Sequence, residues 1–147
     1  MRLALSALGL AVLLAVPDAA LARCRVSERA ATVAEAADFL LASADIVGIA
    51  TVSRAADAAA RRPEVIDVLI PLKGEAGMVT MAPGLRGGGR LISSDARTLG
   101  APAGSLALVA LNRTPEGAVI NQCVARMLAA HPAGPLTRAL MAARPAP

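Results

Sequence analysis

The stretch SLALVALNRTPEGAVINQC, from Ser105 to Cys123, decides the fold. Its apolar first part, up to Leu111, is typical of a buried strand. The tetrapeptide TPEG follows, with Pro115 and Gly117 at the second and fourth positions of a type I turn. The chain then returns as a second strand that ends at Cys123. The stretch therefore predicts a β-hairpin.

Two strands precede this hairpin. Residues 45–52 are apolar on both faces, as in a central strand, and Gly48 inside them predicts a bulge or a sharp bend. From Val65 to Leu72 apolar residues alternate, and Pro71, which lacks an amide donor, marks a sheet edge or strand end.

Shorter strands are expected between residue 73 and the hairpin. The sequence Lys73-Gly-Glu75 predicts a turn, 78–82 a short strand, and 83–90 a loop, after which 91–94 could pair with that strand. Residues 97–104 are expected to be irregular because they hold two glycines and a proline. In total we expect five or six short strands.

Helices are predicted only at the two ends of the chain. Thr32 and Glu35 form a capping box, and an apolar stripe follows from Val33 to Ser43. A second helix is expected for 135–143, with proline in its first turn. Because strands follow strands without helices between them, the fold class is mainly β: a small antiparallel barrel with one N-terminal and one C-terminal helix.

Composition limits the function. The 147 residues are 56% hydrophobic and include one Phe, no Tyr or Trp, two Cys and one His, with a net charge of +4. So few Cys and His residues exclude haem, iron–sulfur and all-protein zinc sites, so no cofactor or metal is expected. The missing aromatic platforms argue against nucleic acid as a partner. A pI of about 10.4 favours anionic envelope components.

Residues 1–22 resemble a secretory signal peptide. Arg2 provides the positive region, Leu3 to Val16 the apolar region, and Ala20-Leu-Ala22 the cleavage site. The apolar run is too short for a hydrocarbon core of about 30 Å, and no later segment could span a membrane. An uncleaved anchor and lipidation at Cys24 are the alternatives. We expect a periplasmic or secreted protein, with one domain over 23–130 and a tail over 131–147.

The expected export bears on the oxidation state of the two cysteines. An even number of cysteines in an oxidising compartment predicts a disulfide, here Cys24–Cys123. Closing so long a loop contributes roughly 4–5 kcal/mol in the chain-entropy model. The competing interpretation is a thiol or metal pair with His131 as a third ligand.

The order of short motifs resembles the netrin-like, or TIMP-like, OB-fold domain of small exported bacterial proteins. The resemblance covers about residues 24–124. It rests on an N-terminal cysteine, the helix end, a strand end, a glycine before the apolar strand, the hairpin and the closing cysteine: Cys24, Ala44-Asp45-Ile46-Val47-Gly48, Leu72-Lys73-Gly74-Glu75, Gly104, Glu116-Gly117 and Cys123. It implies a five-stranded barrel to which the disulfide pins the N-terminal segment.

The animal members of that family inhibit metalloproteases by chelating zinc through the free amine and carbonyl of an N-terminal cysteine. For Cys24 this requires cleavage directly before it, whereas the predicted cleavage leaves Arg23 in front. Val26 also stands where the family has a second cysteine. Because of these two departures, metalloprotease inhibition through Cys24 is an alternative function and not the leading one.

No catalytic constellation emerges from the residues. His131 precedes Pro132 in an apparent loop, and Ser93 and Ser94 lack a nucleophile elbow. The carboxylates Glu64 and Asp67 are interpreted as solvated surface charges that need not converge.

The most unusual segment holds three glycines between two arginines, and it is a possible loop for an anion or a partner: Arg86, Gly87, Gly88, Gly89 and Arg90. A flexible hairpin loop is its competing interpretation. The expected function is an exported, non-enzymatic binding or interaction module of unknown partner. An envelope enzyme that acts on an anionic substrate is the second alternative.

Overall fold

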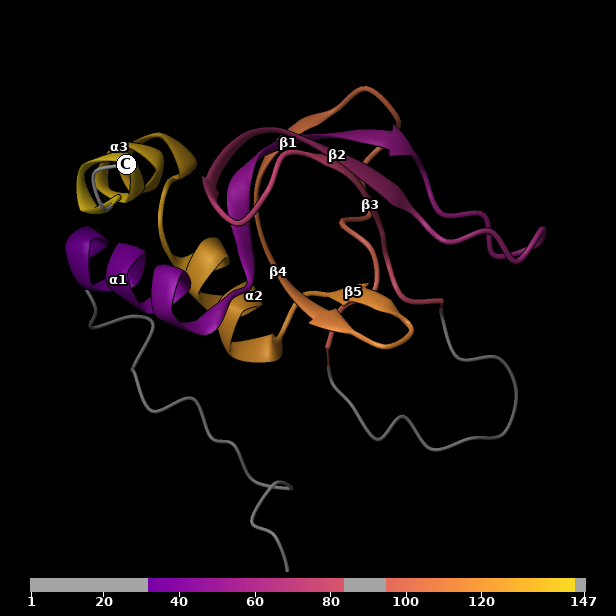
Figure 1. The fold of residues 1–147 in the computed structure, drawn as a ribbon, viewed down its shortest axis with the longest axis horizontal. Coiled ribbons are helices and arrows are strands. Elements are labelled where there is room, and N and C mark those ends of the chain that lie inside the picture. The colour runs from indigo at the N-terminus through magenta and orange to yellow at the C-terminus, as the bar shows by residue number, and fades with distance from the viewer. Residues whose placement is uncertain (1–31, 84–94, 145–147) are drawn as a thin grey trace, which may run out of the picture.

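The computed structural model describes residues 32–83 and 95–144. These residues form a mainly β fold, a five-stranded curled sheet with a group of helices on one side of it (Figure 1). The elements are α1 (Val33–Ser43), β1 (Ile46–Arg54), β2 (Val65–Lys73), β3 (Gly77–Thr80), β4 (Leu106–Thr114), β5 (Gly117–Val119), α2 (Gln122–Ala130) and α3 (Ala133–Ala143).

The sheet is antiparallel, with the strand order β3-β2-β1-β4-β5. It curls so that the two edge strands, β3 and β5, approach each other, and Met81, directly after β3, forms one parallel bridge with Ala118 of β5. At this bridge the Ala82 amide donates to the Ala118 carbonyl oxygen over 2.7 Å. The result is a half-barrel whose two edges pair with each other only at this bridge among the described residues. The mainly β class and the curled antiparallel sheet of five strands agree with the expected barrel.

The central strand β1 requires glycine at position 48. A Cβ atom there would lie 2.6 Å from the carbonyl oxygen of Ile70 on β2. The pairing of β1 with β2 shifts register between Val47 and Gly48, which confirms the predicted irregularity. Pro71 lies beyond the part of β2 that pairs with β3, so its missing amide leaves no gap in that ladder.

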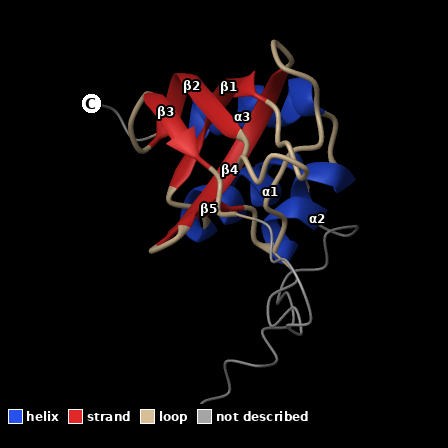
Figure 2. Ribbon diagram, turned by 90° about the vertical axis from the view of Figure 1, so that its right-hand side faces the viewer, coloured by secondary structure: helices blue, strands red, loops and turns tan. Residues whose placement is uncertain are grey.

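The helix α1 begins as predicted. The Glu35 amide donates to Thr32 Oγ1, and the Thr32 amide donates to the Glu35 carboxylate over 2.7 Å. Its buried face, which includes Leu40, packs against α3, where Leu136 and Leu140 are fully buried. Residues expected as a C-terminal tail therefore belong to the same core as the sheet. Figure 2 shows the helices behind the sheet.

Two predictions about the C-terminal part were wrong. The returning strand ends at Val119 instead of Cys123, and a helix not predicted from the sequence, α2, begins at Gln122. Asn121 caps it, since its side-chain oxygen accepts from the Cys123 amide over 2.9 Å. The fold thus has two C-terminal helices, and Cys123 lies in the first turn of a helix.

Candidate functional site

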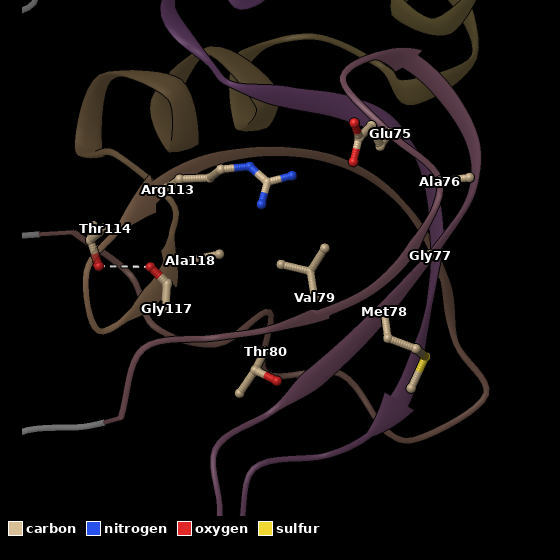
Figure 3. Close-up of a pocket in the computed structure, with 10 residues that line it drawn as sticks. All are labelled: Glu75, Ala76, Gly77, Met78, Val79, Thr80, Arg113, Thr114, Gly117 and Ala118. Atoms are coloured by element: carbon tan, nitrogen blue, oxygen red, sulfur yellow. Dashed lines mark hydrogen bonds between the residues drawn. The ribbon is translucent and has the colours of Figure 1, made fainter.

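The strongest candidate site is the slot between β3 and β5, on the open side of the Met81–Ala118 bridge. It is a cavity of about 320 Å³. One wall is β3 with the residues before it, and the other is formed by the β4–β5 hairpin (Figure 3). Its lining residues are Glu75, Ala76, Gly77, Met78, Val79, Thr80, Arg113, Thr114, Gly117 and Ala118.

The backbone of β3 presents polar groups to this slot. The Met81 amide donates to the Glu64 carbonyl oxygen, so alternate residues of β3 pair with β2. The Ala82 amide points the other way, toward β5. Because backbone direction alternates along a strand, the amides of Thr80 and Met78 also face away from β2. Met78 lies beyond the closing bridge, and no strand within residues 32–83 and 95–144 pairs with its outward-facing amide and carbonyl.

Two charged side chains stand at opposite sides of the slot. In Figure 3 the guanidinium group of Arg113, on β4, points into the space in front of β3, and the Glu75 carboxylate lies across from it. Both residues are exposed. Within residues 32–83 and 95–144, neither side chain has a hydrogen bond or an ion pair. The slot therefore offers one cation, one anion and an unpaired strand edge.

The hairpin wall is held in place locally. Thr114 Oγ1 donates to the carbonyl oxygen of Gly117 over 2.6 Å, and the Arg113 amide donates to the Asp45 carboxylate over 2.7 Å. Gly117 has φ = 135°, and a Cβ atom there would lie 2.8 Å from the Ala82 nitrogen. Glycine is needed at this position for β5 to approach the chain after β3.

A second cavity, of about 520 Å³, lies under the β1–β2 loop and shares no lining residue with the slot. Glu64 lines it and is 1% exposed, the only buried charged residue in the described ranges. Its oxygens accept from the Thr98 hydroxyl over 2.7 Å and from the Leu99 amide over 2.8 Å. The interpretation of Glu64 as a solvated surface charge was wrong.

The sequence-derived site residues are only partly within the described ranges. Cys24, the loop from Arg86 to Arg90, and Ser93 and Ser94 lie outside them. Cys123 is not a free thiol, but its expected partner is not described, so the Cys24–Cys123 disulfide stays a prediction. Pro83, which precedes the loop, lines the second cavity.

His131 does not converge with Cys123. The two residues stand at opposite ends of α2, about 12 Å apart along the helix axis. His131 is half-buried, and its Nε2 has no partner in the described structure. Among the residues that the structure describes, no group of three His, Cys, Asp or Glu side chains could hold a metal ion. Nor is any described helix long and apolar enough to cross a membrane.

Comparisons with known proteins give no family. No family model matches the chain, and neither a curated protein nor a solved structure does so.

Sequence reasoning missed the slot altogether. Met78 and Arg113 are far apart in the chain, and only the curl of the sheet brings them to one cavity. The only sequence signal near it was the short strand predicted at 78–82, which corresponds to β3.

Proposed function

We propose that this protein is an exported, non-enzymatic binding module that receives an extended segment of a partner polypeptide in the slot. The segment pairs with β3 as an additional strand. The observation that carries this proposal is the open edge of β3 at Met78, over a cavity of about 320 Å³. Strand addition uses the main chain of the partner for affinity, so it needs no catalytic residue in the binding protein.

The edge of β3 has the properties that strand addition requires. Folded proteins usually cover or blunt an edge strand, because unpaired amides and carbonyls recruit other chains. Here β3 has four residues, and its exposed side chains, Met78 and Thr80, carry no charge. A short uncharged edge beside a cavity admits one segment of limited length.

The charged pair gives the slot a polarity. Arg113 would contact an acidic side chain or a terminal carboxylate of the added segment, and Glu75 would contact a basic group. Both side chains are exposed, so each contact supplies register and specificity more than affinity. We expect the partner segment to carry opposite charges at its two ends.

We also propose a more specific architecture for the fold than the curled sheet alone. The half-barrel is consistent with a netrin-like OB barrel in which a Cys24–Cys123 disulfide pins the N-terminal segment. Alkylation of unreduced protein taken from the envelope, followed by intact mass measurement, tests the disulfide. We expect no alkylation before reduction and two labels after it. Two labels on unreduced protein would contradict both the disulfide and the oxidising compartment.

Site-specific photo-crosslinking tests the slot. A benzophenone amino acid replaces Met78 in the full-length chain, and envelope extract supplies the partners. The control probe replaces Met141 on α3, which is also a half-exposed methionine, 49% against 62% for Met78. We expect crosslinks from position 78 alone, to one contiguous segment identified by mass spectrometry. Equal crosslinking from both positions would argue against the slot.

A matched pair of variants then separates strand addition from contact with side chains. Thr80→Pro removes an amide that faces away from β2, whereas Thr80→Ala keeps that amide and removes the hydroxyl group. We expect Thr80→Pro to abolish the crosslink from position 78 and Thr80→Ala to preserve it, with both variants folded by circular dichroism. Crosslinking that survives Thr80→Pro in a folded protein would disprove strand addition.

A further inference from the structure

The cavity under the β1–β2 loop is a second site with a different chemistry. Its apolar wall comes from small side chains and prolines, among them Ala58, Pro63 and Ala82. Three arginines, Arg61, Arg62 and Arg97, also line it. A volume of about 520 Å³ is within the range of small-molecule sites.

Two of these guanidinium groups are not neutralised locally. Arg61 and Arg62 are exposed, and in the described ranges their side chains have neither a hydrogen bond nor an ion pair. Arg97 differs from them, because its Nη1 donates to the Pro83 carbonyl oxygen over 2.7 Å and lies 3.6 Å from the Glu116 carboxylate. Its Nε is buried and has no partner in the described structure.

The two carboxylates that line the cavity, Asp57 and Glu64, already accept hydrogen bonds from other groups of the protein. Asp57 Oδ1 accepts from the Ala60 amide over 2.9 Å, which shapes the loop. Both oxygens of Glu64 accept from Thr98 and Leu99. Neither carboxylate lies within 4.0 Å of an arginine nitrogen. The positive charge of Arg61 and Arg62 is therefore available to a ligand.

The backbone of Arg61 supports a functional role for its side chain. Arg61 has φ = 55°, the only non-glycine residue with positive φ in the described chain. It closes the tight loop in which Asp57 and Arg62 exchange backbone hydrogen bonds of 3.0 and 2.9 Å. Glycine or asparagine would adopt this conformation more readily. The loop thus places a guanidinium group, in place of a glycine or asparagine, at the lining of the cavity.

We infer that this cavity binds a small organic oxyanion, with the anionic head on Arg61 and Arg62 and an apolar body against the alanine and proline wall. Planar guanidinium groups pair with carboxylate and phosphate oxygens through two hydrogen bonds at once. Arg97 lines the same cavity. This inference does not depend on strand addition in the slot.

Calorimetric titration of the full-length protein tests the site with two probes, hexanoate and hexyl phosphate, each at low salt. Acetate and inorganic phosphate serve as the matched probes without an apolar body. We expect the hexyl probes to bind at least tenfold more tightly than these, and binding to weaken with added salt. The ratio between hexanoate and hexyl phosphate identifies the preferred head. The absence of binding by both hexyl probes would overturn the inference.

Variants distinguish a ligand site from general basicity. Arg61→Gly and Arg62→Ala are each expected to weaken binding of the preferred probe at least tenfold, while Arg138→Ala, an exposed arginine on α3, leaves it unchanged. Arg61→Gly should also raise the melting temperature, because it relieves the backbone at φ = 55°. Unchanged binding in Arg61→Gly, or an equal loss in Arg138→Ala, would refute the assignment.

Discussion

Lys73 Nζ lies 2.6 Å from the carbonyl oxygen of Ala44, the C-cap of α1, and 2.6 Å from that of Leu41. A strand end thereby supplies the cation for a helix end, where the last carbonyls have no partner within the helix. The slot benefits from this contact, because Gly74 and Glu75 follow Lys73 directly and lead into β3.

Replacing Lys73 by methionine should therefore reduce stability. The substitution keeps the apolar stem and removes two charge-assisted hydrogen bonds, so we expect a loss of about 1–3 kcal/mol in the free energy of unfolding. Urea denaturation measures it. Lys73→Arg, which retains the charge, serves as the control and should lose less. Equal losses in both variants would show that geometry, and not charge, matters at this position.

Glu64 should be essential for the position of the segment 97–104. Glu64→Ala leaves the Leu99 amide and the Thr98 hydroxyl without their acceptor. We expect a loss of about 2–4 kcal/mol, and a smaller loss for Glu64→Gln, which keeps one acceptor oxygen. Thermal unfolding ranks the two variants. Hydrogen exchange at Leu99 should rise in Glu64→Ala, and unchanged protection there would contradict the described contact.

Closure of the barrel depends on Gly117. In Gly117→Ala the new Cβ atom would lie 2.8 Å from the Ala82 nitrogen, at φ = 135°. We expect a loss of about 2–4 kcal/mol and faster exchange of the Ala82 amide, which pairs with Ala118. Gly104→Ala is the matched control, because it has φ = 86° and nothing within 4 Å. It should show the backbone penalty alone, about 1–2 kcal/mol.

The start of α1 should respond to acid. The hydrogen bond from the Thr32 amide, with a further contribution from the Thr32 side chain, lowers the pKa of Glu35. A carboxyl whose folded pKa is depressed stabilises the fold above its unfolded pKa, and this contribution is lost as pH falls through the folded pKa. NMR chemical shifts of the first turn, followed from about pH 6 to about pH 2, should show fraying.

The control for this acid effect is Glu35→Gln. Glutamine can still bond back to the Thr32 amide but does not titrate in this range. The first turn should then show no acid-dependent fraying, whereas fraying equal to that of the natural chain would assign the effect to another carboxyl group.

Local signals explain which parts of the fold were predictable. α1 carries a capping box and an uninterrupted apolar stripe, so its bounds follow from neighbours in the chain. α2 was missed because Val119 and Ile120 extend the strand pattern up to its cap, Asn121. The spacing of Val124 and Met127, three residues apart, was the available helical signal.

The candidate site was less predictable because it depends on tertiary structure. The slot exists because the chain directly after β3 meets β5, at the other edge of the sheet, through Met81 and Ala118. The burial of Glu64 likewise depends on Thr98 and Leu99, which arrive from a distant irregular segment. The hydrophobic periodicity of a short segment does not predict contacts between residues that are far apart in the sequence.

The pairing of α1 with α3 also determines when folding can finish during synthesis. The first described helix packs against the last one, so the buried face of α1, which includes Leu40, lacks this cover until α3 has been synthesised. Until then, the core that α1, the sheet and α3 share cannot be completed.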